Sequence, residues 1–249
     1  MAPPGIGRRV EGVHAVSAAL AAGRGLRLIV EKRRLRHDAI TELVEAARSH
    51  GAEVDVVDSV RDVAESDNPQ GLVLDARPIP VGSIEELVVA DAAILVLDHV
   101  EDPHNVGAAA RSARAAGMTG LVVPERRAAP LGASAFKAAA GALEDLPVAV
   151  VSSTADAVAR LKDRNVWTVG LAADASGSLF GLSLLTEPVA VCIGSEGGGL
   201  SRLVRERLDL LVSIPMASGV ESLNASVTAA LAAFEIARVR TPATGLTSG

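Results

Sequence analysis

A glycine-rich loop directly follows a buried strand in the stretch VAVCIGSEGGGL, residues 189–200. The first five residues are a continuous apolar run, which is typical of a strand buried on both faces of a parallel sheet. Four of the next six residues are glycines, and a helical pattern begins near Ser201. Strand, loop and helix in this order predict an α/β fold that binds a ligand where the strand ends.

The acidic residue Glu196 separates this loop from the common dinucleotide-binding loop. The pattern G-x-G-x-x-G requires glycine at the third position, where Glu196 stands. A carboxylate there repels a pyrophosphate, so a nicotinamide-dependent enzyme with a degenerate loop is the weaker alternative. The loop is better suited to a cationic ligand, or to a neutral ligand that carries hydroxyl groups.

The alternation of helices and strands extends outward from this loop along the whole chain, with mostly parallel sheets expected. Two prolines and a glycine in RPIPVG, residues 77–82, mark a domain boundary, and Ser83 then caps a short helix. We therefore divide the chain into a small α/β domain (1–77), a linker with an entry helix (78–91) and a second domain (92–249). Helices are expected at 13–22, 38–49, 60–64, 106–116, 133–140, 155–162, 201–206 and 223–238, and strands at 26–30, 54–57, 71–76, 93–97, 121–123, 148–151, 166–170, 189–193 and 210–214.

A second polar segment, DHVEDPHNVGAAARS at residues 98–112, also follows a predicted strand. Asn105 is expected near the cap of the next helix, and Arg111 follows six residues later. Gly107 permits close backbone approach, while the helix N-terminus and an arginine together favour an anion such as phosphate. Read alone, Asn105 is equally well explained as a cap and Arg111 as a surface residue.

A third segment, IPMASGVESLNASV at residues 214–227, follows the last predicted strand. Ser222 is expected to open a long helix, with Asn224 in its first turn. Taken singly, each of these two residues is equally well explained by capping alone.

Composition limits the classes of protein to which the chain belongs. The 249 residues are 49% hydrophobic but only 2% aromatic, so the core is aliphatic. Cys192 is the one cysteine, which excludes an internal disulfide, and the five histidines lack metal-ligand spacing, so we expect no metal. No apolar run approaches the ~20 residues of a membrane span, and the N-terminus lacks a signal core, so a cytoplasmic protein is expected.

Charge is unevenly distributed along the chain. The net charge is −6, which argues weakly against a nucleic-acid partner. Residues 1–50 nevertheless hold nine Lys and Arg against five Asp and Glu. Such a basic excess fits either a contact with nucleic acid or an ordinary solvated face.

The three polar segments together are more specific than any one of them. In order, N-x-G-x-x-x-R-S, G-x-E-G-x-G-L and I-P-M followed by S-L-N-x-S-V resemble the SpoU/TrmH class of RNA 2′-O-methyltransferases in the SPOUT superfamily. The resemblance covers Ile94 to about Arg238, and GVHAV at 12–16 and Gln70-Gly71 resemble the substrate-binding domain of RlmB-like members. Two departures lie in the third segment: Ser218 stands where the family usually has glycine, with Gly219 one place later, and Ala225 stands where valine is more usual. Gly219 is expected to adopt the unusual backbone conformation instead.

The resemblance implies a C-terminal trefoil-knotted SPOUT α/β domain and a small N-terminal α/β substrate-binding domain. The knot is expected around residues 194–200 and 214–224, in a homodimer with active sites near the subunit interface. It also implies S-adenosylmethionine as cofactor. The expected cofactor-binding residues are Gly194, Glu196, Gly197, Ile214, Met216, Ser222, Leu223 and Asn224.

The implied activity is methylation of a ribose 2′-hydroxyl, most of all on a guanosine of large-subunit (23S) rRNA. Arg111 is expected to hold an RNA phosphate and stabilise the developing alkoxide, because arginine resists deprotonation. Water or phosphate then takes the proton. Asn105 fixes Arg111 or the ribose, and Glu196 orients either side chain. Ser222 and Asn224 hold the ribose or the cofactor carboxylate. The expected catalytic residues are therefore Asn105, Arg111, Glu196, Ser222 and Asn224.

Three alternatives to rRNA guanosine methylation stay open on the sequence. A tRNA is a possible target in place of rRNA, although the separate N-terminal domain favours rRNA. Antibiotic-resistance relatives share this layout and methylate adenosine or uridine of rRNA. A noncatalytic RNA-binding factor for ribosome assembly is the third alternative, and the presence of all five polar residues argues against it.

Overall fold

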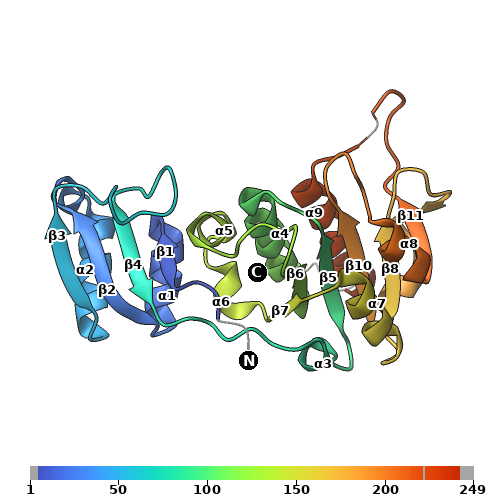
Figure 1. Ribbon diagram of the computed structural model, residues 1–249, viewed down its shortest axis with the longest axis horizontal. Coiled ribbons are helices and arrows are strands. Elements are labelled where there is room, and N and C mark those ends of the chain that lie inside the picture. The colour runs from blue at the N-terminus through green and yellow to red at the C-terminus, as the bar shows by residue number, and fades with distance from the viewer. Residues whose placement is uncertain (1–4, 221, 242–249) are drawn as a thin grey trace.

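The computed structural model describes residues 5–220 and 222–241 and contains two separate sheets joined by an extended segment (Figure 1). Helices and strands alternate along most of the chain, which confirms the predicted α/β class. Within these ranges, no helix is long and apolar enough to cross a membrane.

The N-terminal sheet has four strands in the order β1-β4-β2-β3. Only β2 and β3 are parallel, whereas β4 runs antiparallel to both β1 and β2. The expectation of mostly parallel sheets is therefore wrong for this sheet. A parallel pair needs a crossover helix, which α2 (Asp38–Ser49) provides between β2 and β3, while no helix separates β3 from β4. The strands are β1 (Arg9–Glu11), β2 (Gly25–Glu31), β3 (Glu53–Val57) and β4 (Leu72–Ala76).

Helices α1 (Val13–Ala21) and α2 pack on one face of this sheet. Their buried side chains, such as Leu20 and Leu43, share one apolar cluster with Leu28 and Leu74 from the strands. The other face carries a small cluster around Val60. A short 3-10 helix, η1 (Lys32–Arg36), follows β2.

The helix predicted at residues 60–64 is wrong, because the chain makes only a single turn there. The amides of Val63 and Ala64 both donate to the carbonyl of Val60. Beyond that turn, the Arg9 guanidinium donates to the Val63 carbonyl at 2.6 Å, and the buried Glu11 carboxylate accepts the Glu65 amide at 2.6 Å. The side chains of Arg9 and Glu11 thus bind backbone groups that a second helical turn would otherwise satisfy.

The second sheet has seven strands in the order β7-β6-β5-β10-β8-β11-β9, and each recorded pairing is parallel. Strand β10 lies between β5 and β8, which both precede it in the sequence. The strands are β5 (Ala93–Asp98), β6 (Gly120–Pro124), β7 (Val148–Val151), β8 (Trp167–Leu171), β9 (Gly177–Ser178), β10 (Val189–Gly194) and β11 (Leu210–Ser213).

Both faces of this sheet are covered by helices, which explains why its strands are apolar without alternation. In β5, Leu95 and Leu97 pack in the cluster with α4, α5 and α9, whereas Ile94 and Val96 pack in the cluster with α3 and α7. Cys192 is buried on the second face, and burial raises the pKa of its thiol. The helices are α3 (Ile84–Leu87), α4 (Pro103–Ala115), α5 (Ala133–Ala139), α6 (Ala142–Asp145), α7 (Thr154–Lys162), η2 (Ser183–Thr186), α8 (Arg202–Arg207) and α9 (Ala225–Arg240).

Two helices begin at residues other than those predicted. Helix α4 begins at Pro103 because the Asp102 carboxylate accepts the His104 amide at 2.8 Å, so Asn105 lies inside the first turn. Helix α9 begins at Ala225 because the Asn224 side chain accepts two amides of the first turn. The prediction that Ser222 opens this helix is therefore wrong.

The N-terminal sheet is anchored to the second one through α5 and α6. The Phe136 ring of α5 fills the space beside Gly7, where an added Cβ would lie 2.3 Å from the ring. Arg24 pairs with Glu144 of α6, and both side chains are almost fully buried. The Arg24 guanidinium also lies 5.9 Å from the centre of the Phe136 ring. These contacts fix the two sheets relative to each other.

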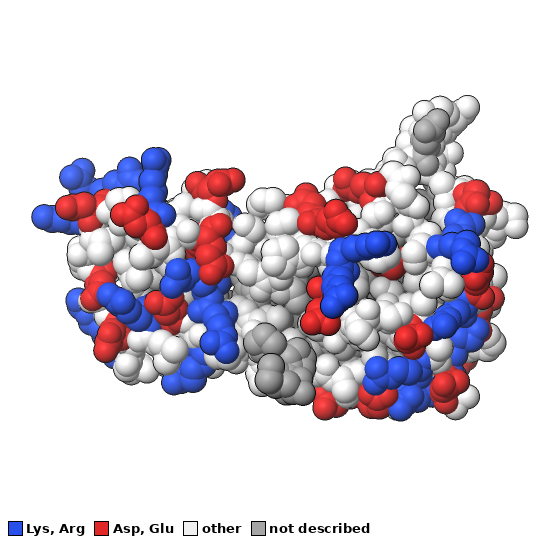
Figure 2. All heavy atoms as spheres, viewed as in Figure 1, with Lys and Arg blue, Asp and Glu red and all other residues white. Residues whose placement is uncertain are grey.

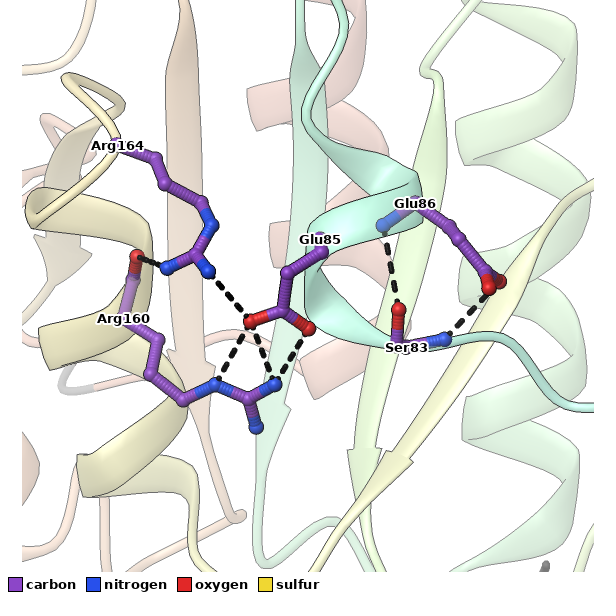
Figure 3. A network of polar contacts seen from close by, with 5 residues as sticks. All are labelled: Ser83, Glu85, Glu86, Arg160 and Arg164. Carbon is purple, nitrogen blue, oxygen red and sulfur yellow. Dashed lines mark hydrogen bonds and ion pairs between the residues drawn. The ribbon is translucent and has the colours of Figure 1, made fainter.

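The linker helix α3 is capped at its N-terminus and clamped to the α7 region by ion pairs (Figure 3). Ser83 caps it as predicted, and Glu86 returns a bond to the Ser83 amide. Glu85 binds Arg160 and Arg164 of the α7 region. Hydrogen bonds from Arg160 lower the pKa of Glu85 to about 2.

Candidate active site

Three loops meet at the edge where the parallel strands of the large sheet end. Residues 99–102 follow β5, residues 195–201 follow β10, and residues 214–224 follow β11. Figure 1 shows the loop after β11 standing out from this edge before the chain enters α9. Because β5 and β10 are direct neighbours, the first two loops lie side by side. The three segments singled out in the sequence thus share one edge of the sheet.

The glycine loop is a tight turn that only glycine accommodates at its base. Ser195 and Gly199 exchange two backbone hydrogen bonds of 3.1 and 2.9 Å. A Cβ on Gly194 would lie 2.0 Å from the carbonyl carbon of Gly199, which backbone atoms cannot tolerate. Gly197 and Gly199 also adopt positive φ angles of 77° and 61°. The loop therefore exposes bare backbone at the end of β10.

An amide–carboxylate cluster, made of Asn105, Glu196 and Asn224, joins the first turn of α4 to the second and third loops. The Glu196 Oε1 atom accepts hydrogen bonds from Asn105 Nδ2 at 2.8 Å and from Asn224 Nδ2 at 2.6 Å. Asn224 Nδ2 also donates to Asn105 Oδ1 at 3.0 Å. Asn105 is buried, whereas Glu196 and Asn224 are exposed. Three predicted catalytic residues thus lie in direct contact, although they are far apart in the sequence.

The first cavity at this edge has a volume of about 280 Å³ and lies over the glycine loop. Apolar side chains form much of its wall. They come from the ends of β8 and β10 and from the loop before α9, and Arg205 also lines the cavity. Arg205 pairs with Asp174 and its hydrogen bond lowers the pKa of Asp174. The predicted cofactor residues that line the cavity are Gly194, Glu196, Gly197, Ile214, Met216, Ser222 and Leu223.

Asn224 does not line this first cavity, although it was predicted to bind the cofactor. Its side chain is instead engaged with the cluster and with the first turn of α9. Sequence reasoning missed the wall contributed by residues 171–173, at the end of β8. The end of that predicted strand was the available signal, because it lies at the same edge of the sheet.

A second cavity of about 510 Å³ adjoins the first and shares Ser195 and Glu196 with it. Asn105 also lines this cavity, together with residues that the sequence analysis did not single out: His99, Val100, Glu101, Asp102 and Arg127. His99 and Arg127 have φ angles of 59° and 53°, which non-glycine residues seldom adopt. Such a conformation leaves no mark in the sequence. Among the described residues, no group of acidic, His or Cys side chains is arranged to hold a metal ion.

Arg111 lies apart from the other predicted catalytic residues. It is exposed on α4 and lines neither cavity. No hydrogen bond or ion pair joins its side chain to another described residue, so neither Asn105 nor Glu196 orients it within this chain. Ser222 is exposed as well, and it belongs to the wall of the first cavity rather than to the cluster.

The third loop accommodates its departure from the family pattern as expected. Gly219 has a φ angle of 87°, the conformation that only glycine adopts without strain. No atom lies within 4 Å of the Cβ that this glycine lacks. The positive φ angle of this loop therefore falls on Gly219, where glycine accommodates it.

Two family models match the two parts of the chain. The SpoU rRNA methylase family matches residues 92–234, and the substrate-binding domain of RNA 2′-O ribose methyltransferases matches residues 9–81. An uncharacterized tRNA/rRNA methyltransferase of Synechocystis is 38% identical over 92% of this chain, which spans 62% of that protein. The 23S rRNA (guanosine-2′-O-)-methyltransferase RlmB of Photobacterium profundum is 37% identical, over 92% of this chain and 96% of that enzyme.

A solved structure agrees with these matches. The SpoU methyltransferase AviRb of Streptomyces viridochromogenes, in complex with AdoMet, superposes with a TM-score of 0.78 and 26% identity. The superposition covers 93% of this chain and 90% of that one. With both parts of the sequence and the fold in agreement, the chain belongs to the SpoU family of RNA methyltransferases.

Proposed function

We propose that this chain transfers a methyl group from S-adenosylmethionine to a ribose 2′-hydroxyl of RNA, on a guanosine of large-subunit rRNA. One observation carries the proposal: Glu196, held by the amide–carboxylate cluster, lies in the wall shared by two adjoining cavities. A methyl donor in the first cavity and a ribose in the second would meet at Glu196. The RlmB relatives, named for this reaction, support the choice of guanosine. Such an enzyme acts in the cytoplasm, where ribosomes are assembled.

The first cavity has the chemistry that this cofactor requires. Leu171, Ile193 and Leu200 offer apolar surface to a purine, and the bare backbone of the glycine loop offers peptide groups to its polar edge. The Glu196 carboxylate complements a positively charged sulfur. When bound, the cofactor supplies a methyl carbon that this charge activates toward nucleophiles. Ser222, in the same wall, is suited to hold the cofactor carboxylate.

The cluster residues orient the ribose in this proposal. Two amides bind the same oxygen of Glu196, so the carboxylate has a fixed direction. Its other oxygen, Oε2, accepts no hydrogen bond from a described residue and is available to a ribose hydroxyl. Asn105 lines the second cavity and shares its wall with Glu196. The residues thereby fix the hydroxyl toward the first cavity, as an in-line displacement demands.

The basic part of the N-terminal domain is proposed to hold the RNA. Lys32, Arg33 and Arg36 of η1 are exposed, and Figure 2 shows Lys and Arg gathered at the outer end of this domain. Phosphate contacts of this kind make RNA affinity fall steeply with salt. The match to the substrate-binding domain family supports the same assignment.

A homodimer is proposed to complete the site. Val227 and Phe234 are 46% and 52% exposed, seven residues apart along one side of α9. A second copy of the chain is the occupant that this apolar stripe favours, because α9 packs beside α4, the helix that carries the exposed Arg111. Arg111 would then serve the second cavity of the partner subunit. Mixing inactive Arg111→Ala and Glu196→Ala subunits would restore activity only if the arginine acts across the interface.

The trefoil knot is part of the same proposal. The chain passes from β5 to β8, returns to β10 between them, and then passes to β11 beyond β8. Helix α9 afterwards packs against α4, and Asn224 contacts Asn105. This path supports a knot that encloses residues 194–200 and 214–224.

The direct test is tritium transfer from labelled S-adenosylmethionine to total rRNA and to total tRNA, each taken from a strain that lacks this gene. Label in the large-subunit rRNA supports the proposal. Label in tRNA alone retains the chemistry and overturns the substrate. Bound cofactor without transfer to either RNA points to a noncatalytic RNA-binding factor.

A further inference from the structure

A histidine backed by a buried carboxylate stands in the wall of the second cavity. His99 lines this cavity with Asn105 and Glu196, and its side chain is 34% exposed. Asp98, the last residue of β5, is completely buried. The His99 Nδ1 atom lies 3.8 Å from Asp98 Oδ1. This separation is longer than a hydrogen bond. A ring that turned to donate from Nδ1 to this carboxylate would keep Nε2 free for a molecule in the cavity.

The Asp98 carboxylate has one oxygen whose hydrogen-bonding capacity is unused. Oδ2 accepts the Ser201 amide at 2.7 Å, which ties β5 to the start of α8. Oδ1 is buried and has no hydrogen-bond partner among the described residues. A buried acceptor without a partner costs free energy, so such atoms in native proteins usually have a role. The His99 Nδ1 atom lies 3.8 Å from this oxygen and is the donor that we assign to it.

The backbone of His99 is held in a strained conformation. Its φ of 59° lies in the left-handed region, and Arg127 across the same cavity has a φ of 53°. Five described non-glycine residues have positive φ, and two of them line this single cavity. Strain of this kind persists where the surrounding structure enforces it, and it concentrates at functional sites.

We propose that His99 is the general base of the reaction and that Asp98 is its positioning residue. The inference rests on the proposed methyl transfer. The ribose oxygen forms a bond to the methyl carbon while the carbon–sulfur bond breaks, and that electron pair stays on sulfur. His99 Nε2 takes the hydroxyl proton, and the imidazolium formed is stabilised by the Asp98 carboxylate before it releases the proton to water. This assignment replaces water or phosphate as the acceptor.

Other charged groups around the cavity affect the same proton. Glu101, Asp102 and Glu196 also line it and favour the imidazolium that the step produces. Arg127 opposes this effect and is suited to an RNA phosphate.

The test compares single-turnover methyl transfer by wild type, His99→Asn and His99→Gly, with saturating rRNA and cofactor. Both replacements tolerate the left-handed backbone. The rate should fall about 10²–10⁴-fold, the usual contribution of a general base, while cofactor and RNA affinities stay within about twofold. Added imidazole should restore part of the rate of His99→Gly and none of that of His99→Asn. His50→Asn, an exposed change in the N-terminal domain, is the matched control.

A second measurement does not depend on turnover. In ¹⁵N NMR spectra, the His99 ring should carry its hydrogen on Nδ1, and Asp98→Asn should shift the ring toward a mixture of tautomers. Asparagine keeps an oxygen for the Ser201 amide, so the fold should be retained.

The outcomes separate this inference from the proposed function. Full activity of His99→Asn overturns the role of His99 as the base. If His99→Gly loses activity, is not rescued by imidazole and binds RNA more weakly, then His99 is a binding residue. That result also overturns its role as the base. Bound cofactor without methyl transfer by the wild type overturns the proposed function itself.

Discussion

Replacing Gly194 by alanine should displace the glycine loop and thereby distort the first cavity. The added Cβ would lie 2.0 Å from the Gly199 carbonyl carbon and 2.2 Å from the Leu200 amide nitrogen. Ordinary contact begins near 3.4 Å, so the loop must move by more than 1 Å. Overpacking of this kind costs about 1–3 kcal/mol of unfolding free energy, and a 1 Å displacement in a reactive site costs about 10²-fold in rate.

Calorimetry with S-adenosylmethionine and thermal unfolding together measure this effect. Gly194→Ala should weaken cofactor binding by at least tenfold, because the displaced loop also carries Glu196. Gly177→Ala is the matched control, since its Cβ would meet Val212 at an ordinary 3.5 Å and it lines neither cavity. Cofactor affinity that is equal in both variants would refute the assignment of the glycine loop as the cofactor wall.

Three further predictions concern a cap, the exposed arginine and the linker clamp. Asn224→Ala should cost about 0.5–2 kcal/mol in urea unfolding, whereas Ser201→Ala, which removes a cap residue without a side-chain bond, should cost less. Arg111→Ala should abolish methyl transfer and leave cofactor affinity unchanged in equilibrium dialysis, because Arg111 lines neither cavity; equal loss of both would contradict its assigned role. The pKa of Glu85 is lowered to about 2 from 4.5, so its stabilisation is present above pH 4.5 and is lost as the pH falls toward 2. The difference in urea midpoint between wild type and Glu85→Gln should accordingly shrink between pH 6 and pH 2.5, and a constant difference would refute the clamp.

The sheet elements and the loops were predictable because their signals are local. The apolar runs at 93–97 and 189–193 placed β5 and β10 correctly, and parallel strands bring their loops to one edge regardless of connectivity. The pairing of Asn105 with Glu196 follows from that shared edge. The antiparallel pairing of β4 was missed because its apolar pattern does not record direction.

The start of α4 and the position of His99 in the site were missed for different reasons. Asp102 followed by Pro103 is a helix-start signal that the sequence contained, and using it would have placed Asn105 in the first turn. At about 100° per residue, Arg111 then lies about 120° around α4 from Asn105, on another face. His99 was unpredictable, because its left-handed backbone and the buried Asp98 beneath it arise from tertiary packing.

The most direct test of the account is an alkaline-cleavage map of rRNA that has been methylated by the purified protein. A methylated 2′-oxygen cannot attack the neighbouring phosphate, so that linkage resists alkali. The account predicts one new resistant linkage, at a guanosine of large-subunit rRNA, with wild-type protein and none with Asn105→Ala. Label on a base whose linkages all remain cleavable, or an identical map with Asn105→Ala, would contradict it.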